Sequence, residues 1–245
     1  INNAEHYIPI DGHPLDTLRS IIKESRFDLP KEIPPMSSGL VGYLGYDTIR
    51  LIEDIPDSNP DTIGIPHGIF FRPTITIVFD SAVDKIFIVR TVRPNQNNPD
   101  TAYKNASESL NKILETLSKP LNKSNVKSKN KINDLPEPTS NVGREGYYSM
   151  VEKAKKYILE GDAFQIVVSQ RLKVPFTLPP FSLYRSLRQV NPSPFLFFLK
   201  FPNFSIIGSS PEILVRIRDQ KITIRPIAGT RPRGKNKQED ENNAK

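Results

Sequence analysis

The sequence predicts an α+β fold in which antiparallel sheets are flanked by helices. Two patterns support this prediction: segments with an apolar residue at every third or fourth position, and short β-branched runs bounded by turn residues. The predicted strands are grouped among the helices rather than alternating with them, which is the order typical of α+β proteins. With 37% hydrophobic residues in 245, the chain has enough apolar material for a sizeable core.

The chain is predicted to consist of three regions. Residues 1–118 form an N-terminal region, 119–142 a variable linker, and 143–245 the first part of a second domain. The linker is rich in Lys, Asn, Ser and Pro and has almost no apolar periodicity. Most of the excess charge behind the net +7 lies at 119–131, without interleaved aromatic residues. We therefore interpret it as a solvated linker, and expect no nucleic-acid partner; heparin retention that is lost on deleting 119–131 would favour the alternative.

In the N-terminal region, three glycines at a spacing of three residues (Gly39, Gly42 and Gly45) stand among aromatic residues. This pattern predicts a strand and turn at 38–47 where another backbone comes close. Apolar periodicity predicts the remaining elements. They are helices at 14–22 and 103–117 and strands at 75–80 and 86–92.

In the second domain, apolar spacing predicts a helix through residues 147–158 that ends at Gly161. A second short helix is expected before Asn191. The other expected elements are extended: a strand at 163–172, two strands at 195–201 and 204–207 that are buried on both faces, and a hairpin of 213–218 with 221–225.

Several classes of protein are excluded by composition. The chain has no cysteine, so it forms neither a disulfide framework nor a thiolate metal site, which is typical of a reducing compartment and predicts a cytoplasmic location. The three histidines lie far apart, and no apolar run reaches the roughly 18 residues of a membrane span. The first and last residues carry no initiator or signal pattern, and we expect the sequence to be an interior piece of a longer protein.

Two side chains are the candidate catalytic residues. Gln165 stands among apolar neighbours in GDAFQIVVSQR, and by alternation it is expected to face the core, where its amide needs partners. The alternative role for Gln165 is to cap loop backbone. Glu212 follows a predicted buried strand in GSSPE, where a carboxyl group in a cleft serves as a general acid; the alternative is an ordinary surface glutamate.

Two further segments are candidate binding sites. In PIAGTRPRG, Gly229 lets backbone N–H groups approach a ligand and Thr230 adds a hydroxyl. The alternative is a basic turn. The segment NPSPFL predicts a rigid corner that leads into a strand. It comprises Asn191, Pro192, Ser193, Pro194, Phe195 and Leu196.

Taken together, GDAFQIVVSQR, NPSPF, GSSPEILVR and PIAGTRPRG resemble the chorismate-utilising enzymes. GLVGYLGYDTIR at 39–50 resembles the matching motif of the anthranilate synthase component I branch of that family. The resemblance covers most of the chain except the linker. It implies a large α+β fold, truncated here, that converts chorismate and ammonia to anthranilate and pyruvate at the start of tryptophan biosynthesis. It also implies a glutamine amidotransferase subunit (component II) that supplies the ammonia, a magnesium ion, and L-tryptophan as allosteric feedback inhibitor.

The resemblance also implies roles for particular residues. Gln165 stands where isochorismate-forming relatives carry a lysine base, and Glu212 matches the acid that protonates the leaving 4-hydroxyl group. Gly229 and Thr230 match the turn that contacts chorismate. Ala228 stands where aminodeoxychorismate synthases carry a lysine nucleophile. The segment 191–196 matches part of the tryptophan pocket, although Phe195 and Leu196 replace the usual Tyr and Met.

Part of the implied active site is expected outside this sequence. The resemblance places the magnesium-binding glutamates, a catalytic histidine and the basic pyruvyl-binding residues after Lys245, and a serine-containing piece of the tryptophan pocket before Ile1. The fragment alone is therefore expected to lack activity. Two alternatives stay open: aminodeoxychorismate synthase component I, which Ala228 disfavours, and a non-catalytic fragment or binding module.

Overall fold

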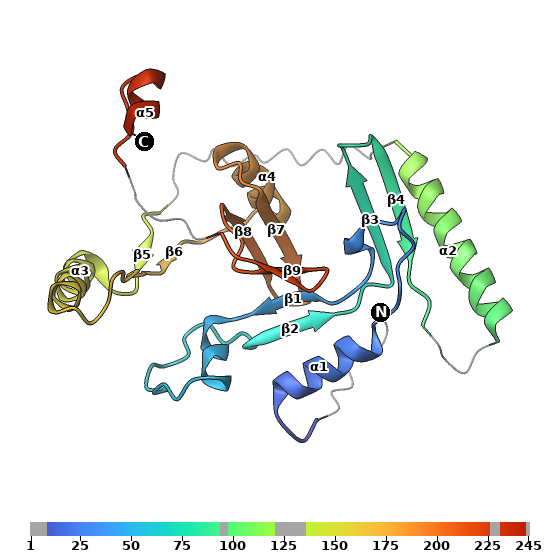
Figure 1. Cartoon of the computed structure of the whole chain (residues 1–245), viewed down its shortest axis with the longest axis horizontal. Coiled ribbons are helices and arrows are strands. Elements are labelled where there is room, and N and C mark those ends of the chain that lie inside the picture. Colours follow the sequence, from blue (N-terminus) through green and yellow to red (C-terminus); the bar gives the residue numbers. More distant parts are fainter. Residues whose placement is uncertain (1–8, 94–97, 121–135, 226–230, 244–245) are drawn as a thin grey trace. The chain divides into compact units, whose positions relative to one another are not determined.

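The chain folds into helices and antiparallel hairpins, as seen in a computed structural model (Figure 1). The structure describes residues 9–93, 98–120, 136–225 and 231–243. Two compact units divide the chain, one of residues 1–125 and one of residues 126–245. Each described strand pairs with one antiparallel neighbour. The α+β prediction is therefore confirmed, whereas the predicted linker lies largely outside the described residues and its role stays a prediction.

The described residues of the first unit form two α-helices and two hairpin-like sheets. Its elements are α1 (Pro14–Glu24), η1 (Pro35–Ser37), β1 (Val41–Leu44), η2 (Tyr46–Leu51), β2 (Gly68–Phe71), β3 (Ile75–Asp80), β4 (Lys85–Arg90) and α2 (Pro99–Ser118). The side chain of Asn98 caps α2 by accepting a hydrogen bond from the Asp100 N–H. Helix α2 lies alongside β4 (Figure 1), where Arg90 donates a hydrogen bond of 3.2 Å to the Ser109 hydroxyl.

The glycine-rich segment of the first unit confirms the predicted close approach of a second backbone. Strand β1 pairs with β2, and Gly42 stands opposite Phe70. A Cβ atom on Gly42 would lie 1.9 Å from the carbonyl oxygen of Ile69, so only glycine fits. Gly45 follows at the end of β1, and its N–H donates to the carbonyl of His67 at 2.6 Å. The partner strand β2 was not predicted from the sequence pattern.

In the part of the second unit that the structure describes, there are three α-helices and three pairs of short strands. Its elements are β5 (Thr139–Ser140), α3 (Gly143–Glu160), β6 (Leu172–Lys173), α4 (Pro180–Val190), β7 (Phe195–Lys200), β8 (Ser205–Ser210), β9 (Arg216–Arg218), β10 (Lys221–Thr223) and α5 (Lys237–Asn243). As predicted, α3 ends at Gly161, whose φ of 85° is the left-handed conformation of a helix stop. The predicted hairpin of β9 and β10 is also confirmed.

Strands β7 and β8 form one sheet with a covered and an open face. On the covered face, the Phe198 ring contacts two rings of α4, at 5.3 Å from Phe181 and 5.9 Å from Tyr184. On the other face, Phe195 and Phe197 remain about 40% exposed. The prediction that these strands are buried on both faces is therefore wrong within the described chain, because α4 covers only one side.

The segment that holds Gln165 also differs from its prediction. A strand was expected at 163–172, with Gln165 facing the core, but regular pairing is limited to β6, which pairs with β5. Gln165 is exposed, and so are its apolar neighbours Phe164 and Val167. The alternating pattern is sound as a strand signal, yet a strand needs a hydrogen-bonding neighbour, and no described strand pairs with residues 163–170.

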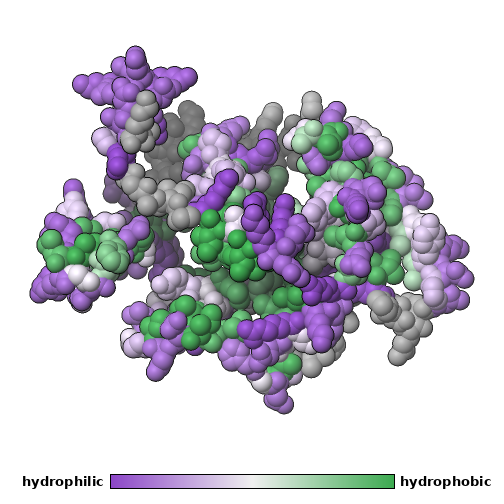
Figure 2. Space-filling view, viewed as in Figure 1, coloured by the Kyte–Doolittle hydropathy of each residue, from purple (hydrophilic) through white to green (hydrophobic). Residues whose placement is uncertain are grey.

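Little of the apolar surface is covered. The chain exposes 22433 Å², whereas a folded protein of its mass exposes about 11,000 Å², and two separate folded units about 13,000 Å². Figure 2 shows hydrophobic residues at many places on the visible surface. Among the described residues, the buried side chains are Ser37, Ala106, Ala154 and Phe201. No helix in the described part of the chain is long and apolar enough to cross a membrane.

The first prediction concerns Gly42. Its replacement by Ala drives a methyl group into the Ile69 carbonyl, and we expect a loss of about 1–3 kcal/mol in the free energy of unfolding. The matched control is Gly146→Ala in α3, where the new Cβ meets nothing closer than 3.5 Å. That control is expected to gain up to about 1 kcal/mol from helix propensity. Denaturant unfolding of both variants measures the difference, and equal stabilities would contradict the close approach at Gly42.

Candidate functional site

Two of the predicted functional segments meet at one end of the β7–β8 sheet. The corner 191–194 leads from α4 into β7, and the segment 210–212 leaves β8. The antiparallel register places Phe195 opposite Ser210 and Leu196 opposite Ser209. The predicted inhibitor-binding residues and the predicted acid, Glu212, therefore come from neighbouring strand ends.

Serine hydroxyls join the two segments. The Ser193 hydroxyl donates to the carbonyl oxygen of Ser210, and the Ser209 hydroxyl donates to the carbonyl oxygen of Asn191 at 2.9 Å. The corner before β7 is thus tied to the end of β8 from both sides. Sequence reasoning included Ser193 in the binding segment but missed Ser209 and Ser210. The available signal was two serines directly before a proline at a strand end, a pattern typical of side-chain-stabilised turns.

Glu212 lies on an exposed turn after β8. Its backbone, rather than its carboxyl group, is held: the Ser210 hydroxyl donates to the Glu212 carbonyl oxygen at 2.9 Å, and the Glu212 N–H donates to the Ser210 hydroxyl at 3.4 Å. Glu212 is exposed, so the cleft expected around its carboxyl group stays a prediction. Gln165 lies in the exposed segment between α3 and β6, so its predicted role in the site stays a prediction.

The predicted chorismate-binding residues Ala228, Gly229 and Thr230 lie outside the described residues. The chain after them is fixed by Asp240. This carboxylate accepts a hydrogen bond of 2.8 Å from the Gly234 N–H and forms an ion pair of 2.5 Å with Arg233. The backbone bond from Gly234, and then the Arg233 guanidinium, lower the pKa of Asp240. Arg233, a side chain suited to bind a substrate carboxylate, is therefore already paired within the chain.

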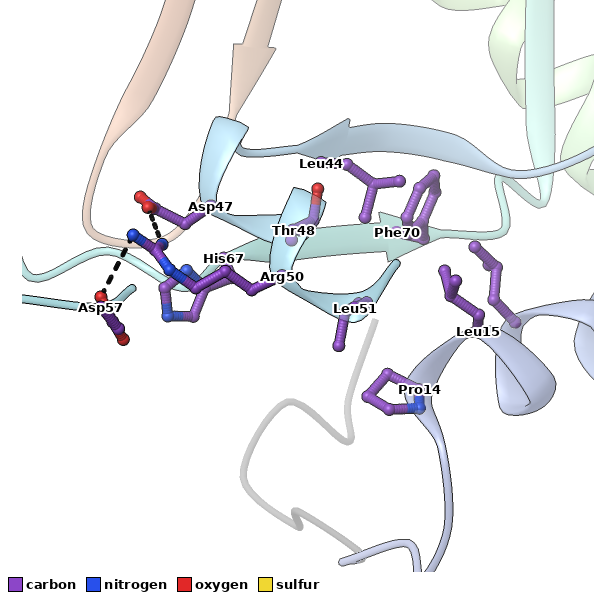
Figure 3. A pocket seen from close by; sticks show the side chains of 12 residues that line it. Pro14, Leu15, Leu44, Asp47, Thr48, Arg50, Leu51, Asp57, His67 and Phe70 are labelled. Atoms are coloured by element: carbon purple, nitrogen blue, oxygen red, sulfur yellow. Dashed lines mark hydrogen bonds and ion pairs between the residues drawn. The ribbon is translucent and has the colours of Figure 1, made fainter. Parts of the chain in front are cut away.

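The first unit contains a cavity of about 480 Å³ between α1, η2 and β2. Figure 3 shows leucine side chains and Phe70 on one side and a cluster of polar side chains on the other. It is lined by Pro14, Leu15, Leu18, Leu44, Asp47, Thr48, Arg50, Leu51, Asp57, His67, Gly68 and Phe70. Four of these residues belong to the glycine-rich motif at 39–50. The motif therefore forms one wall of an apolar cavity as well as the close strand pair.

The charge at the polar end of this cavity is balanced. Arg50 lies between Asp47 and Asp57 (Figure 3), with an ion pair to each, and also donates to the carbonyl of Pro56 at 3.0 Å. The hydrogen bond to Asp47, with the added charge of Asp57, raises the pKa of the Arg50 guanidinium. Because its donors are engaged by these partners, we interpret Arg50 as a side chain that stabilises η2 and the loop after it rather than as an anion-binding group.

No group of three or more His, Cys, Asp or Glu side chains that could hold a metal ion is present among the described residues. The acidic side chains that cluster, such as Asp47 and Asp57, are paired with arginine instead.

The sequence motifs in both units belong to one known protein family. The profile of the chorismate binding enzyme family matches residues 2–245, which is nearly the whole chain. The chain belongs to the chorismate-binding enzyme family. The motif-based resemblance is confirmed, and the serine-linked strand ends of the second unit and the glycine-rich motif of the first are parts of one family sequence.

The related proteins are named as one kind of enzyme. Anthranilate synthase component 1 of Cereibacter sphaeroides is 46% identical over 239 residues, which is 97% of this chain and 47% of the relative. That of Acetivibrio thermocellus is 39% identical over 236 residues, with 95% and 47% coverage. The crystal structure of anthranilate synthase component I from Streptococcus pneumoniae TIGR4 matches with a TM-score of 0.71 and 34% identity, over 88% of this chain and 47% of that one. The chain thus spans about half the length of these relatives.

The second prediction concerns the pKa of Asp240. This pKa is expected to lie below its ordinary value of about 3.8. The bonds of the Asp240 carboxylate to Gly234 and Arg233 therefore stabilise the segment 233–243 at a pH above about 3.8. This stabilisation is lost as the pH falls through the lowered pKa. NMR titration of the carboxyl group measures this. In Arg233→Ala the pKa should rise only part of the way, because the Gly234 N–H, the largest single cause of the lowered pKa, remains. A full return to the ordinary value would assign the effect to Arg233 alone.

Proposed function

We propose that this chain is part of an anthranilate synthase component I, which converts chorismate and ammonia to anthranilate and pyruvate. The observation that carries the proposal is the 46% identity to a protein of that name over 97% of this chain. The chemistry of position 228 supports it. Ala228 offers no amine to attack the ring, so ammonia itself adds at ring carbon 2, as anthranilate formation needs.

The proposal gives this chain three tasks. Glu212 protonates the departing 4-hydroxyl group as ammonia adds, and elimination of pyruvate then leaves the aromatic product. Gln165 lines the path of the nucleophile without acting as a base, because an amide does not take up a proton at neutral pH. Gly229 and Thr230 hold chorismate through backbone N–H groups and a hydroxyl. The proposal assigns the magnesium ligands to the part of the relatives that this chain does not cover.

Two partners belong to the proposal. A glutamine amidotransferase subunit, component II, supplies ammonia in the cytoplasm. L-Tryptophan acts as feedback inhibitor, with the segment 191–196 forming part of its pocket. The exposed prolines and Phe195 of this corner suit the flat apolar ring of the inhibitor.

The third prediction is the product. The full-length protein, given chorismate, magnesium and an ammonium salt, is expected to release anthranilate and an equal amount of pyruvate. Chromatography identifies the aromatic product, and a coupled reduction assay counts the pyruvate. Accumulation of aminodeoxychorismate without pyruvate would instead assign the protein to the aminodeoxychorismate synthases. No conversion of chorismate by the folded protein would refute the proposal.

The fourth prediction tests Glu212 within that reaction. Glu212→Gln removes the proton donor and keeps the shape of the side chain, so kcat is expected to fall about 10²–10⁴-fold while chorismate still binds. The matched control is Glu152→Gln, an exposed glutamate of α3 that pairs with Lys155. It should retain normal turnover. A folded Glu212→Gln enzyme with normal kcat would remove Glu212 from the mechanism.

A further inference from the structure

The turn that carries Glu212 is held by one side chain. Ser210 is the last residue of β8, and its hydroxyl makes two hydrogen bonds to Glu212, one to the carbonyl oxygen at 2.9 Å and one from the N–H at 3.4 Å. A serine hydroxyl has one proton to donate and can accept in return, so both functions are used on the same residue. Between the two residues stands Pro211, whose ring fixes φ near −65°.

This turn is fastened to the neighbouring strand as well. The carbonyl oxygen of Ser210 accepts from the Ser193 hydroxyl, and Ser210 stands opposite Phe195 in the β7–β8 register. Support for the Glu212 backbone therefore extends from the hydroxyl of Ser210 to the corner before β7. The carboxyl group of Glu212 is exposed, so its orientation depends on this backbone support rather than on packing against described neighbours.

We propose that Ser210 is a positioning residue for Glu212, a role that rests on the proposed function. A proton donor works only when it lies within hydrogen-bonding reach of the leaving group, and a displacement of about 1 Å can cost about 10²-fold in rate. Loss of the Ser210 hydroxyl removes both bonds that fix the Glu212 peptide, while the strand pairing of Ser210 is made by its backbone and remains. Loss of this hydroxyl therefore changes the position of the Glu212 carboxyl group and leaves its ability to donate a proton unchanged.

The test compares variants at position 210 in the full-length enzyme. Ser210→Ala should lower kcat about 10-fold to 10²-fold with little change in KM for chorismate. Ser210→Thr keeps the hydroxyl and should restore most of the rate, whereas Ser210→Val has the shape of threonine without the hydroxyl and should not. The control is Ser205→Ala at the opposite end of β8, which should behave as wild type. If Ser210→Ala fails to fold, the comparison of the Thr and Val variants carries the test.

A double variant shows whether Ser210 acts through Glu212. In the Glu212→Gln background, adding Ser210→Ala should cause no further loss of single-turnover rate, because no acid is left to position. An equal fold-loss in both backgrounds would overturn the proposal, and so would wild-type kcat in Ser210→Ala or in Ser210→Val. If Glu212→Gln alone turns over normally, the assignment of Glu212 has failed and the role of Ser210 fails with it. If Glu212→Gln is slow and Ser210→Ala is not, only the positioning role is wrong.

Discussion

The antiparallel register of β7 and β8 places Phe195 opposite Ser210 and so brings the corner 191–194 beside the turn of Glu212. The two serine-to-carbonyl bonds between these segments depend on this pairing, because they form only when the strand ends meet. A shift of one residue would also exchange the two faces of the sheet. Phe198 would then leave the rings of α4, and Phe197 would lose Gly208, over which its ring lies.

A second constraint is the small amount of apolar surface that the chain covers by itself. Every described sheet has two strands, and isolated two-stranded sheets are marginally stable in water. The open face of β7 and the segment around Gln165 expose phenylalanine and valine side chains that a folded protein normally covers. These same places differ from the sequence-based predictions. The chain spans about half the length of its relatives.

Sequence patterns predicted most helices and hairpins because those elements depend on local spacing and stop signals. Gly161 after α3 and the Asp219–Gln220 turn between β9 and β10 are examples, the latter with positive φ at both residues. The predictions failed where a distant partner decides the structure, as for Gln165 and for β2. The corner 191–194 and Glu212 lie side by side because of the strand register, and apolar periodicity alone does not predict a register. The Ser209 hydroxyl was missed for the same reason, since its acceptor, the carbonyl oxygen of Asn191, follows from that register.

The register is most directly measured with paired cysteines, because the chain contains none of its own. Leu199 and Ile206 stand opposite each other at the far end of the hairpin from Glu212, so their replacement by cysteine leaves the serine bonds in place. Side chains of directly opposed residues have Cβ atoms about 4.5–5.5 Å apart, close to disulfide geometry. Under mild oxidation, the pair at 199 and 206 should form a disulfide, detectable by mass spectrometry, while cysteines at 199 and 207 should not. Preferential formation of the 199–207 disulfide would contradict the register on which the site is built.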